Sequence, residues 1–573
     1  MSFRPRLEFS DRRIPFVVAA TGHRDLLSAD IDQLKDSVRS VLVELADSIP
    51  STPLLVLTGL AEGADQLVAQ VALEIGIDFA AVIPMPIGLY SEQMSNNGQR
   101  ELHCLYEKAA LKIHLPMEDL SEERLRNSEP LRIERYQRLA SFMAARSQAL
   151  IALWDGLDSE LKGGTAEVVS RMLKRFEEPT QSEERTFTKS VYHIVTPRLS
   201  NSELPNKFAI RQLWPTDDST PNHKDDYIAV RDDLDRFNHA SAETIADQIV
   251  HVAEGLLDEK IQFSLSSFLS RVAAVHRSAD RLSLRFGKKR NAFLILILVL
   301  ALTGIFGLEL HSEVFSDLDF LWLVFPLSVS AAAGLFIVAK RLRIENQFLD
   351  SRSLAEALRI QFYWGLSGID EPASKHYLLH HRGSIDWIRA ALLNISLFRV
   401  EDTGSPGDTE GMKVTLNLWV EAQVSWFSAK AEQQRRTLAR LERIANRSLC
   451  AVVAFSFLIA LSLLLPAPWH GAWQSLVHEH LNGILHLLIA VPSIALGIFK
   501  IWVDQAGYDE QARNYSHMAN LFAHRANELN QYLDADKLSD ARDVIRDLGI
   551  QALQENGSWL IMHREHPLKV VGL

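Results

Sequence analysis

The sequence predicts a chain of two parts: an α/β domain built on a doubly wound sheet, then an all-α transmembrane domain with four spans and long cytoplasmic helices. Residues 14–198 alternate short apolar runs with amphipathic helical patterns, which is typical of a mainly parallel sheet covered by helices. The C-terminal half holds four apolar stretches without any Lys, Arg, Asp or Glu. Each is long enough to cross a hydrocarbon layer about 30 Å thick as a helix.

The α/β segment supplies six candidate strands with helices between them. Strands are expected at residues 16–21, 54–57, 79–83, 112–115, 149–154 and 191–195, and helices at 30–48, 63–75, 131–145 and 165–175. This alternation favours a Rossmann-like, doubly wound sheet. In such sheets, ligands bind beyond the carboxyl ends of the strands.

The flanks of the apolar stretches predict how they cross the membrane. Spans are expected at 292–308, 320–339, 448–465 and 483–499, with Lys and Arg before the first and third and after the second and fourth. The loops 309–319 and 466–482 contain no Lys or Arg. By the positive-inside rule, both termini and the segment between the two hairpins are cytoplasmic. A buried-core explanation would not give such consistent flanks.

The bulk composition excludes several classes of protein. The chain has 573 residues and a formal net charge of −12, which argues against a general nucleic-acid binder. Two cysteines cannot build a disulfide framework or a thiolate zinc site, so no metal is expected. The first fifteen residues hold four arginines and no apolar segment, so we expect no cleavable signal peptide and a cytosolic first domain.

The composition also suggests where one part of the chain ends and the next begins. We expect a ligand-binding domain at 1–200, a linker at 201–225, a helical stalk at 226–290, the first hairpin with a cytoplasmic helix at 291–399, an acidic loop at 400–412, the second hairpin with flanking helices at 413–548, and a tail at 549–573. The two hairpin segments follow the same plan, which suggests an internal duplication.

Glycine, hydroxyl and charged residues follow three of the expected strands. The candidate ligand-binding residues are Thr21, Gly22, His23 and Arg24; Gly59, Glu62, Gly63 and Asp65; Trp154, Asp155 and Gly156; and Gly163, Gly164, Thr165 and Glu167. Glycine lets a phosphate approach the backbone, and the amides that open the next helix attract anions. Three such turns at one sheet edge favour a nucleotide-type pocket. Each residue also has a structural explanation: Arg24 as a surface ion pair, Asp65 and Glu167 as helix caps, and Trp154 as a pocket wall.

These motifs resemble those of a known superfamily. The runs VVAATGHR, LTGLAEGADQLVAQVALEIG, ALIALWDG and GGTAEV are similar to SLOG domains, which include cytokinin-activating LOG phosphoribohydrolases, DprA-like proteins and nucleotide-sensing regions of channels and bacterial defence effectors. The resemblance covers residues 14–198. Gly163, Gly164, Thr165 and Glu167 match the LOG phosphate loop, although one glycine is absent and the second glutamate is Val168. The DprA-like Gly59, Ala61, Gly63 and Asp65 arrangement resembles sensor members more than hydrolases.

The membrane half resembles SLATT-type effector modules, which are two-span units with a long cytoplasmic helix. Together the two resemblances imply a sensor of a nucleotide-derived signal, either ADP-ribose-like or cyclic, that needs no other cofactor. They imply a homo-oligomeric, channel-like effector of the bacterial inner membrane, which acts in antiviral defence or stress by depolarisation.

Two alternatives remain open. One is a membrane-anchored LOG-like nucleotide N-glycosidase, in which Glu167 assists catalysis and Arg135 or Arg138 holds the phosphate. The other is a scaffold whose α/β domain binds a protein partner.

Overall fold

The computed structural model describes residues 12–117, 120–157, 163–173, 189–215, 223–244, 255–257, 265–313, 315, 317–377, 385–401, 409–462, 487–494, 496–497 and 508–565. These fall into two compact units. The first comprises Met1–Leu282, Asp350–Met412 and Ile545–Trp559, and the second comprises Ser283–Leu349, Lys413–Val544 and Leu560–Leu573.

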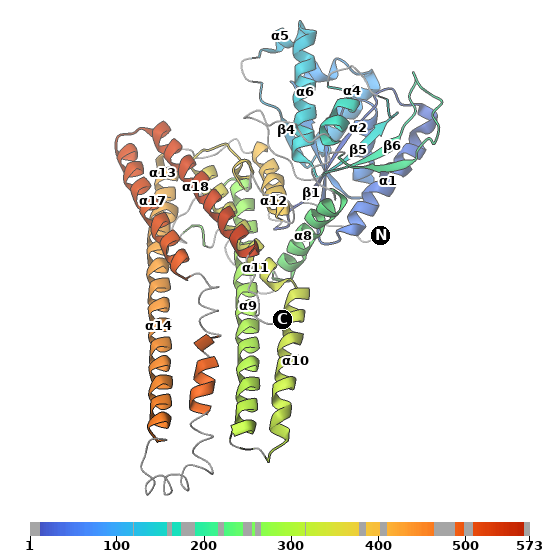
Figure 1. Ribbon diagram of the computed structural model, residues 1–573. Coiled ribbons are helices and arrows are strands. Elements are labelled where there is room, and N and C mark those ends of the chain that lie inside the picture. The colour runs from blue at the N-terminus through green and yellow to red at the C-terminus, as the bar shows by residue number, and fades with distance from the viewer. Residues whose placement is uncertain are drawn as a thin grey trace. The chain divides into compact units, whose positions relative to one another are not determined.

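The first unit contains a seven-stranded sheet in which six strands run parallel (Figure 1). The strand order is β4-β3-β2-β1-β5-β6-β7, and β7 pairs antiparallel with β6 at the edge. The strands are β1 (Phe16–Gly22), β2 (Leu54–Thr58), β3 (Asp78–Ile83), β4 (Leu111–His114), β5 (Ala149–Trp154), β6 (Ser190–Val195) and β7 (Ile210–Leu213). The central strands are buried on both faces, so they appear in the sequence as continuous apolar runs.

All six predicted strands are present, with their ends displaced by at most a residue. The seventh, β7, was not predicted and lies inside the expected linker 201–225. Its residues are mostly exposed, and a solvated edge strand carries no apolar signal.

Helices occupy the connections between the strands. They are η1 (Ser28–Asp30), α1 (Ile31–Ser48), α2 (Ala64–Glu74), α3 (Ile87–Ser91), α4 (Asn96–Lys108), α5 (Glu122–Arg126), α6 (Glu129–Arg146) and α7 (Thr165–Leu173). In α1, the buried residues Leu34, Val38, Val41 and Leu45 repeat every three or four positions, as expected for one apolar helix face. Helix α2 packs beside α1 and α4, whereas α6 packs beside α7.

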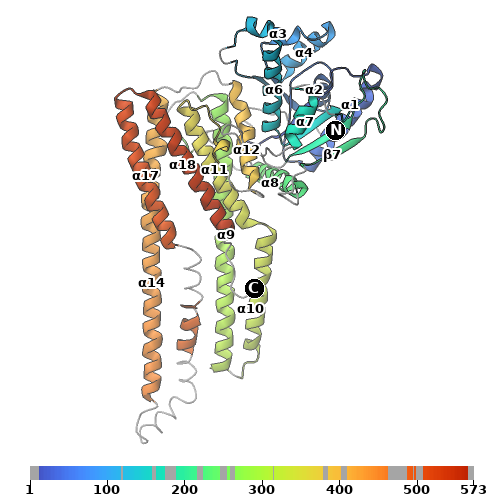
Figure 2. The same ribbon diagram turned by 45° about the horizontal axis from the view of Figure 1, so that its top comes forward.

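The first unit also contains helices from later in the chain (Figure 2). They are α8 (His223–Thr244), the start of α9 (Ser267–Glu313), most of α11 (Ile344–Leu366), η3 (Ala373–Lys375), α12 (Asp386–Ser396), η4 (Leu397–Glu401), the start of α13 (Thr409–Thr415) and the middle of α18 (Leu538–Glu565). Thus helices expected to belong to the membrane modules share a compact unit with the sheet.

Buried amide side chains attach these helices to the amino end of β1. Asn238 of α8 accepts a hydrogen bond from the Ile14 N–H and donates one to the Ile14 carbonyl, both at 2.9 Å. Asn394 of α12 donates to the Pro15 carbonyl at 2.8 Å, and Arg271 of α9 donates to the Arg13 carbonyl at 3.1 Å. Helix α9 is therefore fixed to the chain at the start of the central strand.

The second unit is helical. It comprises the rest of α9, α10 (Phe320–Arg341), η5 (Leu416–Glu421), α14 (Ala422–Ser462) and α17 (Tyr508–Asp534), with the ends of α11, α13 and α18. Helix α17 packs along α14, where Trp419, Trp426, Phe427, Tyr515 and Phe522 form an aromatic cluster.

Within the described residues, two helical stretches are long and apolar enough to cross a membrane: Ser267–Ser312, which belongs to α9, and Phe320–Leu366, which comprises α10 and α11 with a two-residue turn between them. Their most apolar stretches are only 17% and 11% buried, which is the opposite of a soluble core helix. The third predicted span coincides with the end of α14, which the structure describes to Ser462. Of the fourth, 483–499, the structure describes residues 487–494 and 496–497, which are helical, and the rest of this span lies outside the described residues.

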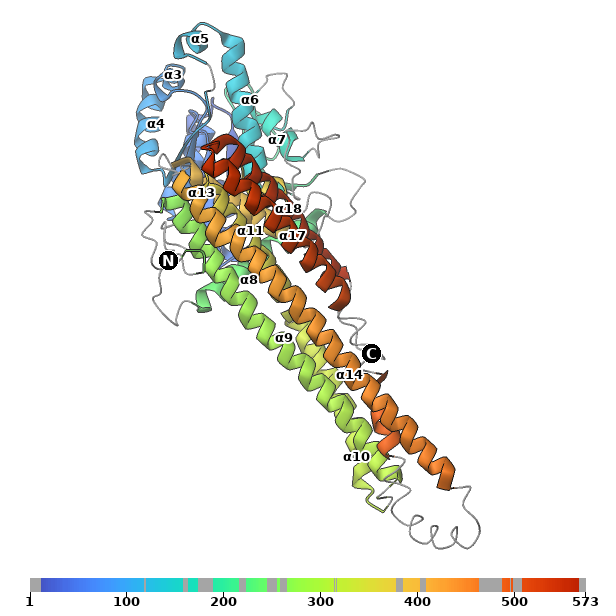
Figure 3. The same cartoon turned by 90° about the vertical axis from the view of Figure 1, so that its left-hand side faces the viewer.

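The two candidate membrane helices form an antiparallel hairpin, visible from two directions in Figures 1 and 3. Two glycines of α9 bring the helix backbones together. A Cβ on Gly307 would lie 2.7 Å from Val324 Cγ1, and one on Gly304 would lie 3.1 Å from Ser328 Cβ. Small residues at such a contact are typical of helix packing in membranes.

Candidate functional site

The three predicted turns lie together at the carboxyl edge of the sheet. They follow β1, β2 and β5, and β1 lies between the other two strands. The His23 N–H donates to the Leu153 carbonyl at 3.1 Å, and the Ala64 N–H donates to the His23 carbonyl at 3.1 Å. Thr21 and Gly22 end β1, so this turn is bonded directly to both neighbours.

Glycine is required where these turns touch. A Cβ on Gly22 would lie 2.4 Å from Ala64 Cβ. Gly63 has a φ of +94°, and a Cβ there would lie 2.6 Å from the carbonyl oxygens of both His23 and Arg24. Leu60, in the same turn, adopts a φ of +53° although it is not glycine. Strained backbone of this kind concentrates at binding sites.

Arg24 and Asp65 place a guanidinium and a buried carboxyl beside this edge. The Arg24 guanidinium carbon lies 5.3 Å from the centre of the Tyr136 ring on α6, within cation–π distance. Asp65 is buried, and a Cβ on Gly59 would lie 3.1 Å from its Oδ2. Burial raises the pKa of Asp65 to about 7, although Arg24 and the backbone N–H groups of Ala61 and Gly59 oppose the rise.

His23 is held as a neutral imidazole. Its Nε2 accepts the Asp155 N–H at 2.9 Å, so the proton is assigned to Nδ1. Burial lowers the pKa of His23, and the nearby Arg198 adds to the effect while Asp155 opposes it. The 3.2 Å approach of Nε2 to Asp155 Oδ1 is therefore not an ion pair. Asp155 pairs instead with Arg198, at 3.1 Å.

Trp154 and Gly156 complete the turn after β5. The Trp154 indole N–H donates to the Leu157 carbonyl at 3.0 Å, and its ring centre lies 5.2 Å from that of His193. Gly156 has a φ of +86°, which permits the turn. Trp154 thus packs against His193 and is bonded within its own turn.

The segment that opens α7 carries the fourth predicted group. Gly163 has a φ of +78°, and its N–H donates to Glu167 Oε2 at 2.5 Å. Glu167 also accepts from Arg171 at 2.8 Å. Partial burial favours a higher pKa for Glu167, but the Gly163 N–H and Arg171 outweigh it and lower the pKa. Glu167 therefore caps the helix as a carboxylate, beside Gly164 and Thr165.

Tyr136 connects this segment to the other turns. A Cβ on Gly163 would lie 2.7 Å from Tyr136 Cβ, so α7 begins in contact with α6. The Tyr136 ring also lies 6.2 Å from that of Tyr90, whose hydroxyl donates to the Gly59 carbonyl at 2.9 Å. Tyr136 therefore contacts Arg24 and Gly163 directly, and Tyr90 links it to the turn after β2.

Glu62 and the two candidate arginines have other partners. Glu62 accepts hydrogen bonds from the Ser95 N–H and hydroxyl at the start of α4. Arg135 is fully buried and donates to the carbonyls of Pro84, Leu115 and Pro116. It therefore joins the two loops that follow β3 and β4 and does not face a ligand.

Arg138 bonds to Glu134 at 3.0 Å on the same helix and is partly exposed. It lies about 200° around α6 from Tyr136. The arrangement leaves Arg24 as the candidate arginine nearest the glycine turns.

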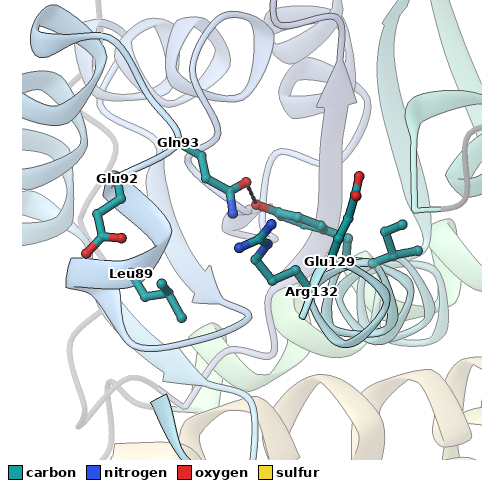
Figure 4. Close-up of a pocket in the computed structure, with 7 residues that line it drawn as sticks. Leu89, Glu92, Gln93, Glu129 and Arg132 are labelled. Atoms are coloured by element: carbon teal, nitrogen blue, oxygen red, sulfur yellow. Dashed lines mark hydrogen bonds between the residues drawn. The ribbon is translucent and has the colours of Figure 1, made fainter. Parts of the chain in front are cut away.

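A pocket of about 310 Å³ adjoins the turns between α6 and the segment that follows α3 (Figure 4). It is lined by Leu89, Glu92, Gln93, Glu129, Arg132, Ile133 and Tyr136. The Tyr136 hydroxyl donates to Gln93 Oε1 at 2.7 Å across it. Sequence reasoning missed these residues, although Glu129, Arg132 and Tyr136 recur at helical spacing on one face of α6.

The pKa of Asp65 gives a pH prediction. Because it is higher in the folded chain, the folded state retains a proton that the unfolded state loses near pH 4. This contribution to the free energy of unfolding is present at low pH and is lost as the pH rises toward 7, by up to ~4 kcal/mol. We expect Asp65→Asn to become progressively more stable than the wild type between pH 5 and pH 8 in thermal unfolding of the full chain. A constant difference would contradict the burial of a protonated carboxyl.

Among the residues that the structure describes, no group of three or more His, Cys, Asp or Glu side chains is placed to hold a metal ion.

A scan against protein-family models found no family that matches this chain, and a search of curated proteins found no significant match.

Proposed function

We propose that this protein senses a phosphorylated, nucleotide-derived metabolite in the cytosol and passes the signal to a membrane effector, as a SLOG domain fused to a SLATT-like module. The observation that carries the proposal is the convergence of the glycine turns after β1 and β2 and the turn before α7 on Arg24, Tyr136 and the adjoining pocket. Arg24 suits a phosphate, and a tyrosine ring suits a base or ribose.

The strand order supports the same location. The chain proceeds outward from β1 to β4 and then returns to the other side of β1 with β5. In Rossmann-like sheets the point where the order reverses is where nucleotides bind, at the carboxyl ends of the strands. The proposed ligand is an ADP-ribose-like molecule or a cyclic nucleotide, because either carries phosphate for Arg24 and a base and ribose for the polar pocket.

Strand β1 offers a route from this site to the membrane helices. Its carboxyl end bears Gly22 and Arg24, and the chain just before its amino end is bonded to Arg271 of α9. Helix α9 continues into the first apolar stretch. A ligand that favours one position of β1 then favours one arrangement of α9, to the extent of its differential affinity for the two.

In this proposal the complete effector has four spans with both termini in the cytoplasm, and it assembles as a homo-oligomer in a bacterial inner membrane. Its opening depolarises the cell as a defence or stress response.

The proposal is tested with the purified full chain in liposomes. Ion flux is measured with ADP-ribose, cyclic nucleotides and nucleoside monophosphates, and binding is measured by calorimetry. Ligand-dependent flux supports a sensor coupled to a channel-like effector. Binding without ion flux would contradict the channel-like effector while leaving the sensor in place. If no compound of the panel binds, the sensor proposal is wrong.

Arg24 provides the sharpest variant. We expect Arg24→Gln to weaken binding of the active nucleotide by roughly 10- to 100-fold, because a charge-assisted hydrogen bond to phosphate is lost. The matched control is Arg100→Gln on α4, where the arginine is exposed and bonds only within its own helix. Equal affinities in the two variants would place the phosphate elsewhere.

The enzymatic alternative is less favoured by the contacts. A LOG-like hydrolase needs an arginine on the phosphate, but Arg135 is buried against three carbonyls and Arg138 pairs with Glu134. Glu167 remains a carboxylate beside the turn, so a role of Glu167 in N-glycosidic bond cleavage can be tested directly. Release of free base from a nucleotide, abolished by Glu167→Ala, would promote the N-glycosidase over the sensor.

A further inference from the structure

The base of the α9–α10 hairpin, within the second unit, carries a dense group of cations. They are Arg285, Lys288, Lys289 and Arg290 on α9, Lys340 and Arg341 at the end of α10, and Arg343 just after it. We call these seven residues the basic collar. Over 283–291 and 340–347 the only acidic residue is Glu345. The collar therefore has a strong local excess of positive charge in a chain whose net charge is negative.

The two halves of the collar lie at the same level of the hairpin. Gly304 contacts Ser328 and Gly307 contacts Val324, which fixes an antiparallel register. Continued toward the base, this register brings Arg341 and Arg343 level with Lys288–Arg290. Phe348 follows Arg343 by five residues and supports the same alignment. Its ring carbons would lie 3.2 Å from a Cβ on Gly287, and its ring centre lies 4.6 Å from the Arg290 guanidinium carbon.

The collar is exposed and adjoins apolar surface. Lys288, Lys289, Lys340 and Arg341 are exposed, and the structure gives them no carboxylate partner among the described residues. At the same level Leu284 and Leu342 are 59% and 55% exposed. Cations beside outward-facing leucines match the boundary between headgroups and acyl chains, where long basic side chains extend their charge toward the polar layer.

The opposite end of the hairpin has the reverse character. Glu309, Asp317 and Asp319 lie there with no Lys or Arg between 309 and 319, and Trp322 is 57% exposed. An exposed tryptophan at the end of an apolar helix is typical of the membrane interface. The excess of positive charge is thus confined to one side of the bilayer.

We propose that the basic collar binds anionic phospholipid headgroups and so gives the hairpin a preference for anionic membranes. The partner is chosen by charge complementarity and by continuity with the exposed apolar faces above it. A basic residue near an anionic surface contributes about a fivefold gain in association. This inference rests on the part of the proposed function that inserts the hairpin into a bilayer, and not on the nucleotide site.

The test uses the full chain reconstituted into phosphatidylcholine vesicles with a trace of spin-labelled phosphatidylglycerol or spin-labelled phosphatidylcholine. The fraction of motionally restricted label gives the relative association of the two lipids. We expect wild-type protein to hold the anionic lipid about fivefold more strongly, and high salt to reduce the difference. A variant with Lys288, Lys289, Lys340 and Arg341 all replaced by Gln should show no preference.

The control variant loses four exposed cations from the first unit: Arg100, Lys108, Arg124 and Lys207, each replaced by Gln. It should keep the wild-type preference. Equal preference in wild type and collar variant, after both resist alkaline carbonate extraction, overturns the collar while leaving insertion intact. Extraction of the wild-type chain by carbonate overturns insertion itself and the collar with it.

Discussion

Replacing Gly63 with alanine is expected to lower the midpoint of thermal unfolding of the full chain in detergent by roughly 10 °C. The backbone at Gly63 has a φ of +94°, which side-chain-bearing residues rarely adopt, and the new Cβ would lie 2.6 Å from two carbonyl oxygens. Backbone cannot move as a flexible side chain does. We therefore expect a loss of ~4 kcal/mol, from the unfavourable φ together with overpacking.

Gly76→Ala is the matched control for this prediction. Gly76 also has a positive φ, of +73°, but no atom lies within 4 Å of its added Cβ. Only the conformational penalty of about 1–2 kcal/mol remains there. Similar midpoints for the two variants would show that the turns after β1 and β2 do not touch as described. Nucleotide binding should fall with Gly63→Ala and stay unchanged with Gly76→Ala.

Arg135→Ala is expected to destabilise the first unit by ~4 kcal/mol, because it leaves three buried carbonyls without their donor. Those carbonyls belong to Pro84, Leu115 and Pro116, which follow β3 and β4. The loss should appear as a lower denaturation midpoint and as faster proteolysis of the N-terminal region. Arg135→Lys should recover only part of it, since one ammonium cannot reproduce the planar guanidinium fork.

Arg138→Ala provides the comparison on the same helix. Its side chain is 38% exposed and its ion pair with Glu134 is solvated, so a loss below about 1 kcal/mol is expected. If Arg138→Ala were as costly as Arg135→Ala, the orientation of α6 described above would be wrong. If neither variant lost stability but both lost nucleotide turnover, the enzymatic alternative would regain its support.

The sheet was predictable because its signal is local. A strand buried on both faces needs an apolar run, and the glycines that follow β1, β2 and β5 mark the strand ends. Edge strand β7 lacked that signal because its side chains face solvent. The grouping of α12 and α18 with the sheet was not predictable either, since buried contacts such as Asn394 with Pro15 join residues far apart in the chain.

The candidate site also contains features that the sequence could predict and features that it could not. The glycine turns are local motifs, and the structure brings them together. Tyr136 and Tyr90 were missed because nothing in their surrounding sequence distinguishes a pocket tyrosine from a packing one. Arg135 and Arg138 were candidates for phosphate because they lie close to the position, about two helical turns before the fifth strand, at which LOG enzymes carry an arginine. Which of them points inward depends on the helices and strands against which α6 packs.

If the protein conducts ions as proposed, the close contact of Gly304 and Gly307 with α10 restricts where they can travel. Two helices whose backbones meet this tightly leave no file of water between them, so the seam inside a hairpin is closed to conduction. In the proposed oligomer, a permeation path would then run along the outer face of this hairpin, against the hairpins of neighbouring copies. Opening of the proposed effector would then rotate or separate whole hairpins, and substitutions that loosen the contact at Gly304 and Gly307 would disturb gating without altering the ions selected.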